Sequence, residues 1–365
     1  MHRLLFSLVA LLLAAAGLAQ PLRFDVVVYG ATPAGIAAAL NAARNGRSVA
    51  LIEPYKQIGG LTTGGLSYTD FRTLESVTGT FREYMSRVEQ HYRGTYGPDS
   101  QQVKDSFYGA MAEPHVSQQI LDRMVAEQKG IQVFLEHRME GVQTERASPE
   151  GVTIGTLRLR DAAAGRVEVS GQIFIDGTYE GDLAALSGAS YRIGRESTVE
   201  YGERFAGVIY LQDGRILPGS TGEADRRVQT YNFRLLMTNN PENRVMVPRP
   251  DGYDRGMYLG LLEQIRNGRI TTIYTEDRSG VLRLQRIPNS KADMNDIKNA
   301  PIRLSLPGSN DEYPDGSPEV RQRIIDAHRI YNQGLLYFLQ NDPDLPAAIR
   351  DQAREWGLAK DEFTA

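Results

Sequence analysis

The sequence of 365 residues contains no cysteine. Disulfide bonds, thiolate zinc sites, iron–sulfur clusters and redox-active dithiol pairs are therefore excluded. Histidine is also scarce, and the five histidines show no ligand spacing such as H-x-x-x-H. Asp293 and Asp296 flank Asn295, but the glycine and the terminal acid of an EF-hand loop are missing. The sequence therefore predicts no metal site.

A large excess of one charge is lacking too, because 41 basic and 45 acidic residues give a formal net charge of −4. A surface for nucleic acid or for anionic membranes is thus not expected. No G-x-S-x-G motif marks a hydrolase elbow. The remaining composition, 41% hydrophobic and 24% charged, is that of an ordinary globular protein long enough for two domains.

Long apolar runs are missing beyond the N-terminus. Residues 1–19 start with a short basic stretch, continue with the apolar run Leu4–Ala16 and end in small residues. This pattern is typical of a secretory signal peptide, here with cleavage before Gln20. The run is too short to span a bilayer comfortably. We therefore expect a secreted or periplasmic protein without a membrane span.

The most informative feature present is a glycine-marked strand–turn–helix, Asp25-Val-Val-Val-Tyr-Gly30-Ala-Thr-Pro-Ala-Gly35. Val26–Val28 predicts a buried parallel strand, and Gly30 permits a tight turn after it. The Ala-rich segment Ile36–Arg44 predicts a helix whose N-terminus would face a pyrophosphate. Thr32 replaces the second glycine of the dinucleotide fingerprint G-x-G-x-x-G. It suits a helix N-cap, and its hydroxyl is in a position to contact the phosphate.

A second strand, Ser48 to Ile52, leads to Glu53. A carboxylate at this point accepts hydrogen bonds from ribose hydroxyls and repels a 2′-phosphate, so NADP is disfavoured. The glycine-rich loop Gly59–Leu66 lets the backbone approach a flat cofactor ring. Together these parts predict dinucleotide binding. The alternative, a non-binding α/β unit with a glycine turn, leaves Glu53 and the second glycine cluster unexplained.

Further elements follow along the chain. Helices are expected at Phe81–Arg93, Val116–Lys129, Pro318–Leu339 and Leu345–Trp356, and strands at Ile131–Leu135, Gly155–Arg160, Val167–Val169 and Gly171–Asp176. This order favours an α/β domain with a parallel sheet over residues 20–190, with a helical insertion at about 67–112. Beyond residue 190, loops with Gly, Pro, Asn and Arg predict a substrate or cap domain over residues 191–365.

These residues resemble the FAD-dependent oxidoreductases of the glutathione-reductase-like, two-dinucleotide-binding type. The resemblance is greatest to a bacterial subgroup, often secreted, in which the turn reads Gly-x-Thr-Pro-x-Gly. The matching segments are Tyr29–Gly35, Ile58–Leu66, Glu113–His115, Asp176–Asp182, Tyr231–Arg234 and Pro288–Asn295. Because they span most of the chain beyond residue 19, the resemblance is not confined to the nucleotide turn.

The resemblance implies an α/β fold class, with a Rossmann-like FAD-binding domain around a parallel sheet and an inserted α+β substrate domain. It implies FAD as the cofactor, with its pyrophosphate at the first turn and its flavin ring near the second glycine loop. The expected cofactor-binding residues are Gly30, Ala31, Thr32, Pro33, Ala34, Gly35, Glu53, Pro54, Gly59, Gly60, Leu61, Thr62, Gly64, Met139, Asp176 and Gly177.

One departure concerns the C-terminus. Members of this family return, after the inserted domain, to a segment that completes the flavin domain and covers the isoalloxazine ring. This sequence stops at Lys360-Asp-Glu-Phe-Thr-Ala365, where that return would begin. We therefore expect either a truncated product or a second polypeptide that completes the flavin domain.

Candidate reactive residues are few, because the flavin performs the redox chemistry. The candidates for catalysis are His115, Glu180, Arg195 and Tyr201, with His115 preferred because histidine titrates near neutral pH. Residues expected to bind a polyhydroxylated or anionic substrate are Arg234, Asn289, Lys291, Asp293 and Asn295. For each of these residues a structural or solvated role is the alternative.

The sequence thus predicts an FAD-dependent oxidoreductase that transfers a hydride to or from a small organic or sugar-derived substrate. The electron acceptor stays unknown. One alternative is a non-catalytic nucleotide-binding protein that has lost the flavin cover. Another is a carbohydrate-active lyase or isomerase that uses FAD structurally, which the polar residues of the second domain permit.

Overall fold

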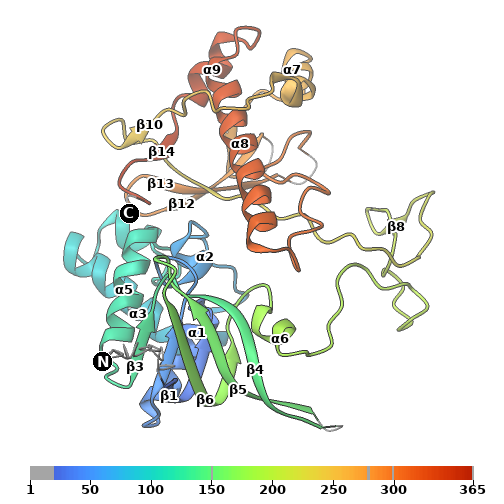
Figure 1. Ribbon diagram of the computed structural model, residues 1–365. Coiled ribbons are helices and arrows are strands. Elements are labelled where there is room, and N and C mark those ends of the chain that lie inside the picture. Colours follow the sequence, from blue (N-terminus) through green and yellow to red (C-terminus); the bar gives the residue numbers. More distant parts are fainter. Residues whose placement is uncertain (1–19, 149–150, 278–279, 298–299, 364–365) are drawn as a thin grey trace, which may run out of the picture.

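The computed structural model describes residues 20–148, 151–277, 280–297 and 300–363. The signal peptide predicted for residues 1–19 lies outside these residues. Figure 1 shows two units, each built around its own sheet and joined by a long connection. Within the described part of the chain, no helix has both the length and the apolar character needed to cross a bilayer.

β1 (Leu22–Tyr29) is the central strand of the first sheet. It pairs in parallel with β2 (Val49–Ile52) on one side and with β6 (Arg166–Asp176) on the other. β3 (Ile131–Phe134) adds a further parallel strand beyond β2, so that the sheet order is β3-β2-β1-β6-β5-β4. The chain after β1 turns one way to reach β2, while β6 lies on the other side. The strand order therefore reverses at β1. In open α/β sheets, ligands bind at the carboxyl ends of the strands where the order reverses.

β4 (Arg138–Ser148) and β5 (Gly151–Arg160) continue the sheet from β6 as an antiparallel meander. The sequence predicted two separate strands where the structure has the single strand β6. A small residue permits this continuity, because a Cβ added at Gly171 would lie 2.7 Å from Cγ2 of Val27 on β1. A larger side chain at this position would therefore require Val27 to shift.

Successive side chains of β1 point to opposite faces of the sheet and enter two different cores. Val26 and Val28 pack against α1 (Pro33–Arg44), α3 (Gly79–Tyr96) and α5 (Pro114–Ala126). Val27 and Tyr29 contribute instead to the core that includes residues of the meander. The helices expected in these regions are confirmed, each with ends shifted by a few residues.

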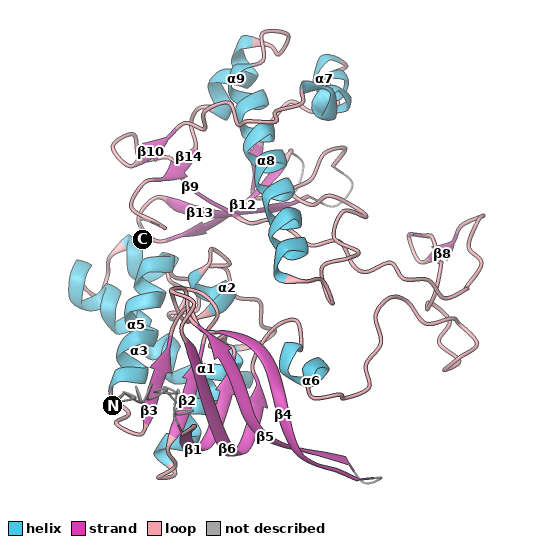
Figure 2. Cartoon of the chain, viewed as in Figure 1, coloured by secondary structure: helices cyan, strands magenta, loops and turns pink. Residues whose placement is uncertain are grey.

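Short helices complete the first unit. These are α2 (Gly60–Thr63), a 3-10 turn (Leu74–Ser76), α4 (Gln101–Asp105) and α6 (Asp182–Leu186). From there residues 187–231 form an extended arm that leads to the second unit, and the small pair β7 (Leu211–Gln212) and β8 (Arg215–Ile216) lies at its far end (Figure 2).

The second unit is a mixed sheet with the order β10-β14-β9-β13-β12-β11. Its strands are β9 (Leu235–Thr238), β10 (Arg244–Val245), β11 (Tyr274–Thr275), β12 (Leu282–Ile287), β13 (Lys291–Asp296) and β14 (Gly357–Ala359). The sequence predicted none of these strands. Its helices are the 3-10 turn Arg255–Tyr258, α7 (Leu259–Arg266), α8 (Pro318–Asn341) and α9 (Ala347–Ala353).

The core of the second unit forms between this sheet and α8 and α9. Trp356, the only tryptophan of the sequence, is 4% exposed within it. The guanidinium of Arg286 lies 6.0 Å from the centroid of the indole ring. The expected α/β fold class is confirmed, with a Rossmann-like unit followed by an α+β unit.

Candidate cofactor and substrate site

The turn between β1 and α1 is shaped by glycines that pack on one another. Gly30 has a φ of 97°, which L side chains rarely adopt, and an added Cβ there would lie 2.6 Å from the nitrogen of Thr178. A Cβ at Gly35 or at Gly177 would overlap the carbonyl oxygen of Gly30. The end of β6 is therefore packed directly on the turn, and the N-terminus of α1 opens beside it.

Thr32 is the N-cap of α1. Its hydroxyl accepts a hydrogen bond from the N–H of Gly35 at 3.4 Å and donates one to the carbonyl of Gly177 at 2.6 Å. Pro33 occupies the first helical position, where no N–H is needed. The hydroxyl of Thr32 is thus turned inward to join the turn to β6. A glycine at this position could not form these two hydrogen bonds, and the contact of Thr32 with a phosphate stays a prediction.

Glu53 follows β2 and is only 5% exposed. Its carboxylate accepts hydrogen bonds from the N–H of Ala31 at 2.8 Å and from the N–H of Tyr55 at 3.1 Å. Burial raises the pKa of Glu53, and the two N–H groups oppose that rise. Each oxygen keeps a lone pair that is free for a ribose hydroxyl. Pro54, the residue between the acid and Tyr55, continues the chain away from β2.

The second glycine loop lies against the first turn. The N–H of Gly59 donates to the carbonyl of Ala31 at 2.7 Å, and Gly59 and Gly60 both have positive φ. The hydroxyl of Tyr179 accepts a hydrogen bond from the N–H of Leu61 at 2.9 Å. A Cβ at Gly60 would lie 2.5 Å from that hydroxyl. Two further predicted cofactor residues, Thr62 and Gly64, lie in α2 and at its C-cap.

Asp176 ends β6 and organises the chain that follows it. One carboxylate oxygen accepts hydrogen bonds from the N–H and the hydroxyl of Thr178, at 3.0 and 2.6 Å. The other accepts the N–H of Ala184 in α6 at 2.9 Å. The N–H of Gly177 donates to the carbonyl of Tyr29 at 2.7 Å. In this structure Asp176 holds the turn and the start of α6 in place.

Met139 lies at the edge of a cleft of about 600 Å³. Its backbone N–H donates to the hydroxyl of Tyr29 at 3.0 Å. Burial raises the pKa of Tyr29 to about 12, so this phenol stays protonated. Arg138 and Glu180 also line the cleft. The cleft thus adjoins the carboxyl end of β1, on the meander side of the sheet.

Asp293 on β13 connects the two units. It is fully buried, and one carboxylate oxygen accepts the N–H groups of Ser67 and Tyr68, directly after the second glycine loop, at 3.1 and 3.3 Å. Both of its oxygens contact Arg234 at 2.7 Å. Burial raises the pKa of Asp293, and Arg234 opposes that rise. Asn295 joins this network through Gln285.

Lys291 on β13 forms a second connection. Its ammonium is 1% exposed and contacts Glu113 at 2.7 Å, Asp361 at 2.8 Å and Glu362 at 2.6 Å. Asn289 donates to the same Glu113 at 2.7 Å. Burial alone would lower the pKa of Lys291, but the carboxylates around it raise that pKa above its ordinary value. The predicted substrate residues are therefore assembled here, yet they pair with partners inside the protein.

His115 lies at the first turn of α5, beside this cluster. Its Nδ1 lies 2.7 Å from Oε1 of Glu362, whose other oxygen accepts the backbone N–H of His115 at 3.0 Å. The hydrogen bond to Glu362 raises the pKa of His115, and partial burial opposes that rise. Glu113, His115 and Glu362 lie close enough to hold a metal ion. The ammonium of Lys291 already lies between the two carboxylates, so a cation is not needed there.

The other catalytic candidates lie elsewhere. Glu180 accepts a hydrogen bond from the hydroxyl of Tyr313 at 3.2 Å, at the cleft near Met139. Arg195 pairs with Asp225 within the arm. Tyr201 is 65% exposed on the same arm. The structure does not bring these three side chains together with His115.

The comparison with protein families now bears on this geometry. The model of the FAD dependent oxidoreductase family matches residues 25–365. The chain belongs to the FAD dependent oxidoreductase family. The prediction of FAD as the cofactor is confirmed by this membership.

Matches to single proteins are shorter or more distant. A segment of 41 residues is 58% identical to the soluble pyridine nucleotide transhydrogenase of Hahella chejuensis, which covers 11% of this chain and 9% of that protein. The chain therefore spans about a tenth of the curated relative it matches. Among solved structures, AlpK superposes over 74% of this chain and 43% of its own, with 13% identity and a TM-score of 0.36. THI4 of Thermovibrio ammonificans superposes over 48% and 67%, with 14% identity and a TM-score of 0.30.

The residues at the carboxyl ends of β1, β2 and β6 fit the cofactor of this family. First-turn N–H groups of α1, such as that of Ala34, have no intrahelical partner and favour a pyrophosphate. Glu53 offers lone pairs to a ribose. The glycines of both turns leave no side chain between backbone and ligand, and a Cβ at Gly30 would disrupt the turn.

The motifs did not identify every residue of this site. Tyr179 bonds to the N-terminal end of α2, and it stands inside the matched segment Asp176–Asp182, so the signal was present. Arg138 lies 5.7 Å above the ring of Tyr55, beside Glu53. No motif marked Arg138 or Tyr55, because their roles depend on the ends of β2 and β4 coming together in space.

Proposed function

We propose that this member of the family binds FAD with its ADP half at the β1–α1 turn and its flavin ring toward the Gly59–Leu66 loop. When bound, FAD supplies the two-electron acceptor or donor for hydride transfer. The substrate proposed is a small organic or sugar-derived molecule that enters between the two units. The electron acceptor stays unnamed in this proposal.

The observation that supports this proposal best is the hydrogen bond of 2.8 Å from the N–H of Ala31 to Glu53. It joins the phosphate-binding turn to the ribose-binding acid, so the two halves of an ADP site are fixed relative to one another. Preorganisation of this kind reduces the free-energy cost of binding. Tyr179, which reaches Leu61, holds the second glycine loop at the same edge of the sheet.

The first experiment is an absorbance spectrum of the purified chain, taken before and after incubation with FAD and desalting. Flavin bands at about 370 and 450 nm that survive desalting support the proposal. Anaerobic addition of candidate substrates should then bleach the longer-wavelength band. A colourless protein after FAD treatment would contradict the proposal and favour a non-catalytic nucleotide-binding protein.

Ala34 provides a sharper test, because it is exposed in the first turn of α1. An acid there is compatible with the helix, since the N-terminal end of the dipole favours negative charge. Ala34→Glu should therefore fold normally and bind FAD about tenfold more weakly or worse, through repulsion of the pyrophosphate. Ala34→Gln has nearly the same size without the charge and is the matched control. Equal affinities of the two variants would place the pyrophosphate elsewhere.

We also propose that the protein is exported from the cytoplasm, on the basis of the leader at residues 1–19. Cell fractionation of a strain that expresses the tagged chain tests this proposal. Mature protein outside the cytoplasm that begins at Gln20 supports it. Full-length protein retained in the cytoplasm would contradict it.

A further inference from the structure

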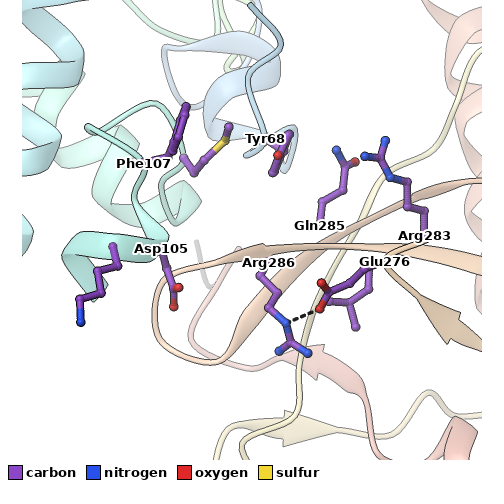
Figure 3. Close-up of a pocket in the computed structure, with 10 residues that line it drawn as sticks. Tyr68, Asp105, Phe107, Glu276, Arg283, Gln285 and Arg286 are labelled. Carbon is purple, nitrogen blue, oxygen red and sulfur yellow. Dashed lines mark hydrogen bonds and ion pairs between the residues drawn. The ribbon is translucent and has the colours of Figure 1, made fainter. Parts of the chain in front are cut away.

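A cavity of about 380 Å³ lies between the two units, apart from the ADP site. One wall comes from the first unit, through Tyr68, the end of α4 and the loop that follows it. The other wall comes from β12 and from Glu276, which follows β11 in the second unit. Figure 3 shows Tyr68 and Phe107 on one side and Arg283, Gln285 and Arg286 on the other. This volume suits a small organic molecule.

A chain of hydrogen bonds ties this cavity to the loop proposed to meet the flavin ring. Tyr68 follows that loop, and its N–H donates to Asp293. Asp293 pairs with Arg234, whose Nη2 donates to Oε1 of Gln285 at 2.8 Å. Gln285 lines the cavity. Hydrogen bonds therefore connect Gln285 in the cavity wall to the residue that follows the glycine loop.

The second-unit wall presents hydrogen-bond donors. Gln285 is 5% exposed, and its oxygen is occupied by Arg234 and by Asn295 at 3.0 Å. The amide of Gln285 therefore has only N–H groups to offer a ligand. Beside it, Nε of Arg283 is buried and has no hydrogen-bond partner among the described residues. A buried guanidinium nitrogen without a partner is costly unless a ligand satisfies it.

The charges around the cavity leave an excess of positive charge. Three cations line it, Lys104, Arg283 and Arg286, against two acids, Asp105 and Glu276. Arg286 and Glu276 pair with each other at 2.7 Å, and both are more than half exposed. Asp105 accepts a hydrogen bond from Gln101 at 2.7 Å. Glu276 balances the charge of Arg286, and Asp105 offsets the charge of Lys104, so the excess positive charge belongs to Arg283 and favours an anion over a neutral polyol.

Beyond Lys104 and Asp105 of α4, the opposite wall is apolar and includes residues with unusual backbone conformations. Phe107 and Tyr108 have φ values of 44° and 58°, a left-handed conformation that non-glycine residues adopt only at a cost in free energy. This geometry keeps Phe107 stacked on Phe71 at 6.0 Å, and Phe107 still lines the cavity. Met111 and Tyr68 complete the apolar wall. Strained residues of this kind cluster at ligand-binding sites.

We propose that this cavity is the substrate site and that it takes a small carboxylic acid with a flat apolar body. The carboxylate binds Arg283 and the amide of Gln285, and the apolar body packs between Phe107 and Tyr68. This inference rests on the proposed function, because it identifies the cavity as the place where the flavin meets its substrate. A single guanidinium without a partner suits one carboxylate.

The test measures binding directly, so that it does not depend on turnover. Benzoate, 3-phenylpropanoate and indole-3-acetate are titrated by calorimetry into the purified full chain, with and without FAD. The corresponding neutral amides, of the same shape, are titrated in parallel. We expect at least one acid to saturate the protein at millimolar concentrations or below, and the amides to bind at least tenfold more weakly. Failure of all three acids to bind, or equal binding of acids and amides, would overturn the proposal.

Variants then locate the acid. Arg283→Gln should weaken binding of the acid tenfold or more, since charge-assisted hydrogen bonds are the strong ones. Arg283→Lys keeps the charge and should recover part of that loss, which separates recognition from damage to the fold. Arg215→Gln removes an exposed arginine of the arm and should change nothing. An acid that binds Arg283→Gln and the unmodified chain equally would overturn the assignment.

The two proposals fail in different ways. A chain that retains FAD but binds none of the acids keeps the proposed function and loses the substrate class. A chain that binds an acid through Arg283 but retains no FAD keeps the anion site and loses the proposed function. Flavin absorbance of Arg283→Gln after desalting should equal that of the unmodified chain, because Arg283 lies on β12, outside the ADP site.

Discussion

The carboxylate of Glu53 accepts the backbone N–H of Ala31 at 2.8 Å, across the gap between β2 and the turn after β1. This bond gives the acid two tasks. In the proposed site it would offer lone pairs to a ribose, and it fixes the turn whose next residues are proposed to contact the pyrophosphate. Because Glu53 is buried, replacing it changes both the cofactor site and the fold around it.

Glu53→Gln partly separates the role of Glu53 in cofactor binding from its role in holding the turn. Glutamine keeps one acceptor oxygen but places an NH₂ group against the second N–H, so one buried hydrogen bond is lost. We expect the free energy of unfolding to fall by about 1–3 kcal/mol. FAD affinity should fall about tenfold from the lost acceptor. Urea unfolding and flavin titration measure the two effects. Glu145→Gln, at an exposed position on β4, is the control and should leave both unchanged.

Glycine at position 35 is required by its neighbours. A Cβ there would overlap the carbonyl oxygen of Gly30, and this contact is with backbone that cannot move aside. Gly35→Ala should therefore lower the free energy of unfolding by several kcal/mol, or prevent folding. Gly94→Ala is the control, because nothing lies within 4 Å of its added Cβ in α3. The free energy of unfolding of that variant should rise by about 0.5–1 kcal/mol, because alanine has the higher helix propensity. Thermal unfolding measures both effects. Midpoint temperatures that change by similar amounts in Gly35→Ala and Gly94→Ala would contradict the packing of Gly35 on Gly30.

Because Lys291 lies within a buried ion cluster, we expect one substitution there to lower the free energy of unfolding strongly. Lys291→Met leaves Glu113 buried without a cation and leaves Glu362 with His115 alone as a cationic partner among the described residues, which costs about 3–5 kcal/mol. Equilibrium urea unfolding, followed by circular dichroism, measures this cost. The control is Lys129→Met, which removes an exposed lysine after α5. If Lys291→Met lowered the free energy of unfolding no more than the control does, the carboxylates around position 291 would have to be protonated or solvated.

His115 and His91 should give opposite pH dependences. Glu362 raises the folded-state pKa of His115, so its stabilising contribution is complete below the unfolded pKa of about 6.5. That contribution is lost as pH rises through the higher folded pKa. Burial lowers the pKa of His91, so its contribution is present at higher pH and is lost as pH falls.

Urea unfolding from slightly acidic to slightly basic pH tests this pair of signs. The stability difference between the unmodified chain and His115→Gln should shrink as pH rises. The corresponding difference for His91→Gln should grow as pH rises. If the stability differences for His115→Gln and His91→Gln changed with pH in the same direction, Glu362 would not be raising the pKa of His115.

The sequence predicted the cofactor half of the fold well because its signals are local. Gly30 and Gly35 flank a strand and a helix that follow each other directly, and Glu53 ends the next strand. The positions of Gly30, Gly35 and Glu53 are set by the strand and helix beside them in the sequence, so a local pattern is enough to predict them. The positions expected for the turn, helix and second strand agree with β1, α1 and β2 within a few residues.

The second sheet could not be predicted in this way. β13 reads Lys-Ala-Asp-Met-Asn-Asp, in which Lys291 and Asp293 are buried. Their burial depends on Glu113 and Arg234, which lie far away in the sequence, so the local pattern resembles a loop. For the same reason, the residues predicted to bind substrate are paired inside the protein, Arg234 with Asp293 and Lys291 with Glu113. The cavity residue Arg283 carried no motif at all.

Trp356 lies in the core of the second unit, and the flavin would lie in the first. The chain therefore has two optical reporters, one in each half, that can be followed during a single denaturation. Coincident loss of indole emission and flavin absorbance would mean that the halves unfold together. If indole emission changed before or after flavin absorbance, the halves would unfold separately, in spite of the contacts that Lys291 makes with Glu113 and Asp293 with Ser67 and Tyr68.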